Sequence, residues 1–141
     1  MMRRIYLDSC AVIYAIEGTT ELRARIGAVL LPPNEESPCV IYTDLTRLEC
    51  RVKPLAEENT GLIKTYDDFF STPGYEKHAL DTPTFDLATD LRARYRIKTP
   101  DALHLAAAIN AGCVQFWTND AHLTRAAAGR IAVVPCNSEN S

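Results

Sequence analysis

Three features that mark common classes of small protein are missing from this sequence of 141 residues. Its five cysteines are odd in number and form no C-x-x-C pair, which argues against both a disulfide framework and a zinc cage. Its three histidines form no H-x-x-x-H pair. No apolar stretch approaches the roughly 18 residues of a membrane-spanning helix, and the apolar run after the basic N-terminus is too short for a signal peptide. We therefore expect a cytoplasmic protein without a membrane segment.

An excess of positive charge is also missing, since 15 Lys and Arg stand against 18 Asp and Glu, for a net charge of −3. Proteins that grip nucleic acid over a broad surface are usually basic, so a nucleic-acid role here needs a local basic patch or a metal ion that meets the phosphate. The apolar fraction of 47% and the charged fraction of 23% are typical of a globular domain. We expect one domain over residues 1–141, with 136–141 as a loose tail.

Short apolar runs alternate with helical patterns along the whole chain. Strands are predicted at Ile5–Leu7, Cys39–Tyr42, Val114–Thr118 and Ile131–Val134, and residues 75–80 fit either a short strand or a loop. Because helices separate the strands, we expect an α/β fold of three layers, α/β/α, around a central and mainly parallel sheet of about four to five strands.

Helix starts and stops are marked by capping residues, proline and glycine. Ser9 is expected to cap the first helix, and Pro54 to limit the helix that Thr43 or Asp44 begins. Thr82-Pro83 and Thr99-Pro100 each predict a cap followed by proline at the first helical position. The first predicted helix runs through residues 11–16 and stops near Gly18, and the third carries Leu45, Leu48 and Glu49. The other helices are predicted at about residues 21–31, 56–70, 82–95, 101–111 and 122–128.

Four acidic residues fall where the predicted sheet would gather them. Asp8 ends the first strand, Asp120 follows the third through Thr118-Asn119, Glu49 lies in the helix after the second strand, and Asp101 lies in the first turn of a helix. Parallel strands share one carboxyl edge, which is where open α/β sheets bind ligands. Taken singly, each acid also suits a helix start or a turn. Together, they predict a cation, because clustered carboxylates otherwise repel one another.

The oxygen ligands predict magnesium or manganese rather than zinc, and hence metal-assisted hydrolysis. We expect Asp8, Asp101 and Asp120 to bind the metal, while Glu49 either binds it or orients the attacking water. Hydroxyl and amide side chains beside these acids are expected to support the ligands by hydrogen bonds: Ser9, Thr118 and Asn119.

With these residues in place, the chain resembles a PIN-domain ribonuclease, specifically the VapC-like toxin of a VapBC-type toxin–antitoxin pair. The resemblance rests on three stretches and on Glu49 between the first and the second: Ile5-Tyr6-Leu7-Asp8-Ser9, Thr99-Pro100-Asp101-Ala102-Leu103-His104-Leu105-Ala106-Ala107-Ala108, and Phe116-Trp117-Thr118-Asn119-Asp120-Ala121-His122-Leu123. Their order and spacing span nearly the whole chain and are more specific than any one stretch.

The resemblance implies a toxin that hydrolyses RNA with Mg²⁺ or Mn²⁺, a cognate antitoxin as partner, and a homodimer. Asp8, Glu49, Asp101 and Asp120 match the acidic positions of the family, while Ser9 and Thr118 match its supporting hydroxyls. The alternative is a catalytically silent PIN-type binding module in a protein or RNA assembly. The intact acidic set argues against this alternative.

Two further groups of residues have an ordinary interpretation beside a functional one. A basic run either holds RNA phosphates or is a solvated helix end: Arg92, Arg94, Arg96 and Lys98. His104, three residues after Asp101, is expected to be a packed core histidine in an alanine-rich helix rather than a general acid.

Overall fold

Five parallel strands form the central sheet of the protein, whose computed structural model describes residues 2–136. The sheet has the order β3-β2-β1-β4-β5. Its strands are β1 (Arg4–Leu7), β2 (Cys39–Tyr42), β3 (Glu76–Lys77), β4 (Gln115–Thr118) and β5 (Ala132–Pro135). Every pairing between neighbours is parallel. The expected α/β fold with a parallel sheet of four to five strands is confirmed, and the ambiguous segment 75–80 begins with the short edge strand β3.

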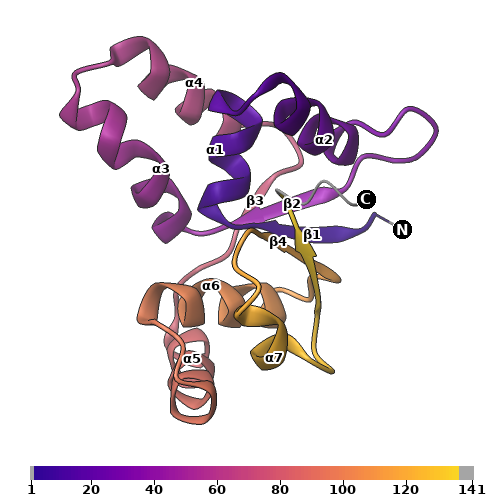
Figure 1. Ribbon diagram of the computed structural model, residues 1–141, viewed down its shortest axis with the longest axis vertical. Helices are drawn as coiled ribbons and strands as arrows, with labels where there is room; N and C mark the ends of the chain where they lie inside the picture. The colour runs from indigo at the N-terminus through magenta and orange to yellow at the C-terminus, as the bar shows by residue number, and fades with distance from the viewer. Residues whose placement is uncertain (1, 137–141) are drawn as a thin grey trace.

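Helices cover both faces of the sheet and complete the three predicted layers (Figure 1). One layer contains α1 (Ser9–Glu17), α2 (Thr20–Leu30), α3 (Asp44–Ala56) and α4 (Thr60–Phe70). The other contains α5 (Thr82–Tyr95), α6 (Thr99–Asn110) and α7 (Leu123–Ala127). No helix in residues 2–136 is long and apolar enough to cross a membrane.

The core is split in two because side chains of a strand alternate between the faces of the sheet. In β1, Tyr6 packs into the cluster under α5–α7, whereas Ile5 and Leu7 pack into the cluster under α1–α4. All three side chains are fully buried, as expected for a strand covered on both faces. β1 is therefore the most enclosed strand, and its carboxyl end is a rigid place to mount a functional side chain.

Three predicted helix caps are wrong by one residue. Asp8, not Ser9, caps α1, and its Oδ1 accepts a hydrogen bond from the Ser9 backbone N–H at 2.7 Å. Asp81 rather than Thr82 caps α5, and Lys98 precedes α6 without a side-chain capping bond. Proline fits the first turn of a helix, so Thr-Pro locates the helix starts correctly but leaves the capping residue open to ±1.

The boundary between α3 and α4 also differs from the prediction. Pro54 lies inside the last turn of α3, which ends at Ala56, so the predicted helix over 56–70 begins only at Thr60. The break comes from Glu58, whose positive φ of 54° is incompatible with a right-handed helix, and from Asn59, whose side chain caps α4. Thr43 caps α3 in a reciprocal capping box with Thr46, which confirms one of the two predicted caps.

The C-terminal end of the sheet extends past the predicted tail boundary. Cys136 is fully buried, and its backbone N–H donates to the Thr118 carbonyl at 3.0 Å. The tail expected at 136–141 is therefore wrong for its first residue, and residues 137–141 lie outside the described part of the chain.

Candidate metal centre

Two neighbouring strand ends bring Asp8 and Thr118 together. β1 pairs with β4 so that Leu7 lies opposite Trp117, and the Asp8 backbone N–H donates to the Trp117 carbonyl at 3.0 Å. The buried Thr118 hydroxyl donates to Asp8 Oδ2 at 2.8 Å and accepts the Asp120 backbone N–H at 3.2 Å. Thr118 thus links the two strand-end acids, in the supporting position that the sequence predicted.

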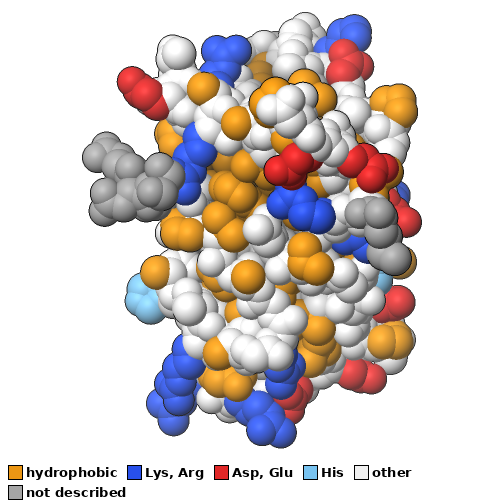
Figure 2. Space-filling view, turned by 90° about the vertical axis from the view of Figure 1, so that its right-hand side faces the viewer, with side chains coloured by type: hydrophobic (Ala, Val, Ile, Leu, Met, Phe, Trp, Pro, Cys, Tyr) orange, Lys and Arg blue, Asp and Glu red, His pale blue; other side chains and the backbone are white. Residues whose placement is uncertain are grey.

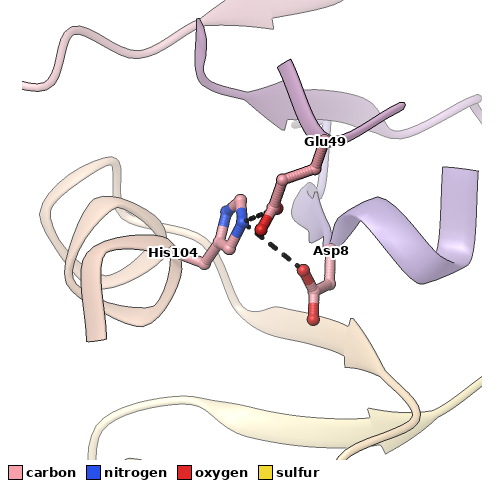
Figure 3. A group of neighbouring side chains, drawn as sticks. All are labelled: Asp8, Glu49 and His104. Atoms are coloured by element: carbon pink, nitrogen blue, oxygen red, sulfur yellow. Dashed lines mark hydrogen bonds and ion pairs between the residues drawn. The ribbon is translucent and has the colours of Figure 1, made fainter. Parts of the chain in front are cut away.

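Glu49 and His104 face Asp8 from helices on opposite layers (Figure 3). His104 Nε2 lies 2.6 Å from Glu49 Oε1 and 3.6 Å from Asp8 Oδ1. The imidazole is almost fully buried, with 1% of its surface exposed. His104 is packed in the core as expected, but it also belongs to the acidic cluster, which sequence reasoning did not predict. Its spacing of one helical turn from Asp101 was the available signal.

The tautomer of His104 follows from its second partner, Tyr6. The Tyr6 hydroxyl lies 2.6 Å from His104 Nδ1 in a fully buried position. Burial is the largest of the effects that raise the pKa of the Tyr6 phenol, and the charges of Asp8 and Glu49 add to it. A phenol that keeps its proton donates to Nδ1, so the imidazole carries its own proton on Nε2 and donates it to Glu49. We assign this tautomer from the hydrogen-bond network.

The charge of Glu49 is stabilised by this arrangement. Burial alone would raise the pKa of its carboxyl, but the hydrogen bonds from His104 and from the Ser9 hydroxyl bring the pKa below its ordinary value. Glu49 is therefore held as a carboxylate and oriented by groups from α1 and α6.

Asp101 shows the opposite effect. Burial and the negative charges of Asp8 and Asp120, with a smaller contribution from Glu49, raise the pKa of its carboxyl, although His104 opposes them. The fold therefore brings Asp101 close enough to the other three predicted acids for each of them to disfavour its charge. Such repulsion is relieved when a cation binds among the carboxylates.

The donor atoms fit a small divalent ion. One ligand atom from each of Asp8, Glu49 and His104 lies within 4.8 Å of the others. The two carboxylates supply the hard oxygen donors that Mg²⁺ and Mn²⁺ favour. In the assigned tautomer both ring nitrogens of His104 are already engaged, with Tyr6 and with Glu49, so His104 orients a ligand rather than binding the ion itself. This group differs from the predicted ligand set of Asp8, Asp101 and Asp120, which remains a prediction.

The remaining predicted supports have separate contacts. Asn119 Nδ2 donates to the Tyr14 hydroxyl at 3.0 Å, so its amide ties the loop after β4 to α1. Asp120 Oδ1 accepts the His122 backbone N–H at 2.9 Å and lies 3.0 Å from its Nδ1. Asp120 Oδ1 is thus already engaged by hydrogen bonding within the turn that contains His122.

The structure divides the predicted basic run into two parts. Arg92 Nε donates to the Ile97 carbonyl at 3.0 Å, and Arg94 Nε pairs with Asp90 at 2.8 Å. Arg96 and Lys98 instead line a cavity that also includes Asp101 and Asp120. Arg96 and Lys98 are therefore the two residues of this run that stand beside the acids.

Comparison with known proteins identifies a family for almost the whole chain. The family model described as the PIN domain matches residues 5–129. No curated protein matches the chain in sequence.

Several solved structures share the fold at low sequence identity. A chain of the VapBC2 complex from Rickettsia felis bound to promoter DNA has 15% identity and a TM-score of 0.72, over 94% of this chain and 98% of that one. A toxin–antitoxin complex from Klebsiella pneumoniae gives 19% identity and a TM-score of 0.69, over 94% and 97%. DNA-bound VapBC from Salmonella typhimurium has 19% identity and a TM-score of 0.65, over 96% of this chain and 99% of that one.

Proposed function

The chain belongs to the PIN domain family, and on that basis we propose that it is a divalent-metal-dependent endoribonuclease that acts as the toxin of a toxin–antitoxin pair. The observation that carries the proposal is the meeting of Asp8, Glu49 and His104 at the carboxyl edge of the sheet, with Asp101 electrostatically coupled to it. Asp8 is buried, and burial together with the neighbouring carboxylates raises the pKa of Asp101, so a cation bound among these acids would relieve their repulsion.

In the proposed reaction, Asp8, Asp101 and Asp120 would hold the ion. Bound Mg²⁺ or Mn²⁺ would polarise the phosphoryl group and lower the pKa of a water molecule. Thr118 fixes the orientation of Asp8 through its 2.8 Å hydrogen bond, with Ser9 as a second support. Glu49, charged and held by His104, would either bind the ion as well or accept a proton from the attacking water.

The toxin role is supported by the neighbours in structure. The complexes from Rickettsia felis, Klebsiella pneumoniae and Salmonella typhimurium are described as VapBC or toxin–antitoxin assemblies. We propose a cognate antitoxin as the partner of this chain as well, and a cytoplasmic location for the pair. The proposed activity also implies that RNA is the substrate of the protein.

We assign the homodimer contact to an apolar stripe on α3. Leu48, Val52 and Leu55 lie on one face of this helix, and 59%, 58% and 62% of their surfaces are exposed. Two copies of one helix face can cover each other about a two-fold axis, which is the commonest oligomer symmetry. Glu49 follows Leu48 on the same helix, so such a dimer would place its contact next to the metal centre.

The first test compares wild-type protein, freed of any antitoxin, with Asp8→Asn on total RNA. Cleavage is expected in Mn²⁺ or Mg²⁺, and it should be lost both in chelator and in the Asn variant, because the amide keeps the shape but not the charge that holds the ion. Asp86→Asn, which changes an exposed acid on α5, is the matched control.

Cleavage that survives both chelator and Asp8→Asn would refute the proposed site. Absence of cleavage in every sample, together with no Mn²⁺ binding by calorimetry, would favour the catalytically silent binding module instead.

A further inference from the structure

A cavity of about 790 Å³ opens directly beside the acidic residues. Its wall is made by the end of α5, the start of α6, α7 and the loop before α7, and it includes Asp101 and Asp120. The volume lies within the roughly 300–1,000 Å³ that is typical of small-ligand sites. A ligand bound in this cavity would therefore contact Asp101 and Asp120 directly.

Three cations in the cavity wall have no carboxylate partner in residues 2–136. They are Arg96, Lys98 and Arg125, all with exposed side chains. Of the other basic residues of this half, Arg94 and Arg130 pair with Asp90, and Arg92 donates to the Ile97 carbonyl. Three of the six Lys and Arg residues in 82–136 therefore lie at the cavity without a carboxylate partner in the described part of the chain.

The backbone fixes where two of these cations stand. Arg96 ends α5 in the left-handed conformation, with φ of 56°, and its backbone N–H donates to the Arg92 carbonyl. Ile97 is buried in the core under α5–α7, while its neighbours Arg96 and Lys98 are exposed. The buried Ile97 therefore fixes the backbone from which the Arg96 and Lys98 side chains extend.

The same cavity contains an aromatic surface. Tyr95 lies in its wall, and the Arg125 guanidinium carbon is 5.8 Å from the centroid of the Tyr95 ring. Unpaired bases stack on tyrosine rings and on guanidinium planes, whereas bases in a duplex are already stacked on each other. The wall thus combines contacts for phosphate with contacts for a splayed base.

The distribution of charge agrees with this combination. The lower end of the molecule, formed by α5–α7 in Figure 1, carries several Lys and Arg side chains in the face shown in Figure 2. Residues 82–136 contain six Lys and Arg against four Asp and Glu, although the whole chain is acidic. Two of those four acids are Asp101 and Asp120, which a bound cation would neutralise.

We propose that this cavity binds one nucleotide of single-stranded RNA next to the cleaved phosphodiester, with phosphate on Arg96 and Lys98 and the base against Tyr95 and Arg125. The proposal rests on the proposed ribonuclease function and deepens it, because it names the strand state of the substrate and the residues that hold it. It also explains how an acidic protein reaches an anionic substrate, since only one local surface needs to be basic.

The test measures RNA binding separately from cleavage. The Asp8→Asn protein in Mn²⁺ is titrated against a fluorescein-labelled eight-nucleotide single-stranded RNA of mixed sequence, by anisotropy over a series of KCl concentrations. Arg96→Gln and Lys98→Gln should each weaken binding and reduce the slope of log K against log [KCl] by roughly 0.7, the value for one lost single-strand phosphate contact. Arg94→Gln, which removes one positive charge near the end of α5, where Arg94 pairs with Asp90, is the control and should leave the slope unchanged.

The aromatic contact has its own pair of variants. Tyr95→Leu should weaken binding about tenfold or more without changing the salt slope, and Tyr95→Phe should keep the affinity. Thermal melts check that both variants fold, and the exposed Arg96 and Lys98 variants keep the proposal testable if Tyr95→Leu does not. A duplex of the same sequence should bind more weakly than the single strand.

The outcomes separate this proposal from the ribonuclease itself. If protein with intact Asp8 cuts RNA but Arg96→Gln and Lys98→Gln bind like Arg94→Gln, the nucleotide site is wrong and the nuclease stands. If RNA binding depends on the cavity but no metal-dependent cleavage occurs, the nuclease is wrong and the nucleotide site stands.

Discussion

His104 Nε2 lies 2.6 Å from Glu49 Oε1, so a buried histidine from α6 holds a proposed catalytic acid from α3 on the other side of the sheet. The other ring nitrogen of His104 is 2.6 Å from the Tyr6 hydroxyl on β1. This chain of three residues crosses all three layers of the fold. It makes the position and charge of Glu49 dependent on core packing rather than on the helix surface alone.

Replacement of His104 should move the pH dependence of cleavage. His104 lowers the pKa of Glu49, so His104→Ala should raise that pKa and shift the acidic limb of the pH–rate profile to higher pH. We also expect a loss of activity of roughly 10–100-fold, as for other residues that orient ligands. His104→Gln, which keeps a donor for Glu49, should recover part of both effects. An acidic limb that stays in place in His104→Ala would mean that Glu49 does not limit the rate.

Tyr6→Phe should destabilise the protein while leaving most of the ring packing intact. The variant removes the donor to His104 Nδ1 and leaves that buried nitrogen without its partner, which costs about 1–3 kcal/mol. The stacked ring of Phe116, 5.3 Å from Tyr6 between centroids, should be unaffected. Chemical denaturation of both proteins in chelator measures the difference. Equal stability would mean that the hydrogen bond between Tyr6 and His104 does not contribute to folding.

Asp101→Asn should stabilise the metal-free protein at neutral pH and abolish metal-dependent cleavage. The folded pKa of Asp101 is raised above its ordinary value of 3.8, so the folded state binds this proton more tightly than the unfolded chain does. Stability is therefore lost as the pH rises from 3.8 through the folded pKa, and the charged carboxylate is destabilising above that window. Asn removes this penalty, by an amount of the order of 1 kcal/mol or less.

Thermal unfolding in chelator at neutral and at acidic pH checks this sign. The stabilisation by Asp101→Asn should be present at pH 7 and vanish below about pH 3.8, where the wild-type carboxyl is protonated in both states. Added Mn²⁺ should stabilise the wild type and not the variant. A variant that is less stable than wild type at pH 7 in chelator would contradict the electrostatic account of the site.

Thr118→Val should weaken metal binding without changing the shape of the core. Valine replaces a hydroxyl that donates to Asp8 Oδ2 at 2.8 Å and accepts the Asp120 N–H at 3.2 Å. Metal affinity measured by calorimetry should fall by roughly 10–100-fold, the usual effect of losing such a support. Thr118→Ser retains the hydroxyl and serves as the control. Equal metal affinities for the Val and Ser variants would show that the Thr118 hydroxyl does not support metal binding.

Leu48→Asp tests the proposed dimer. A charge on the exposed stripe of α3 should reduce the molar mass of the antitoxin-free protein from that of a dimer to that of a monomer in light scattering. Leu31→Asp places the same charge at an exposed residue just after α2, where 77% of the leucine surface is accessible, and should leave the mass unchanged. A dimer that persists in Leu48→Asp would place the contact elsewhere.

Much of the architecture is present in local sequence patterns. Short apolar runs, Thr-Pro steps and alternating helical segments predict the parallel sheet and its helices, because strand and helix formation depend on neighbours within a few residues. The wrong predictions of helix boundaries are also local. Pro54 is tolerated inside α3, and the break between α3 and α4 falls at Glu58 and Asn59. Capping competes between adjacent polar residues, which is why Asp8 rather than Ser9 takes the first cap.

The sequence by itself determined the four acids and the sheet edge at which they gather, since the order of strands and helices leaves few ways to arrange Asp8 and Asp120. Only the tertiary structure decided how these acids differ from one another. Glu49 is held charged by His104, which lies 55 positions away in sequence, while Asp101 is destabilised by Asp8 and Asp120, which come from other segments of the chain. The tertiary structure also decided that Arg94 pairs with Asp90 while Arg96 and Lys98 line the cavity. Whether a cation is paired depends on which carboxylate the fold places beside it.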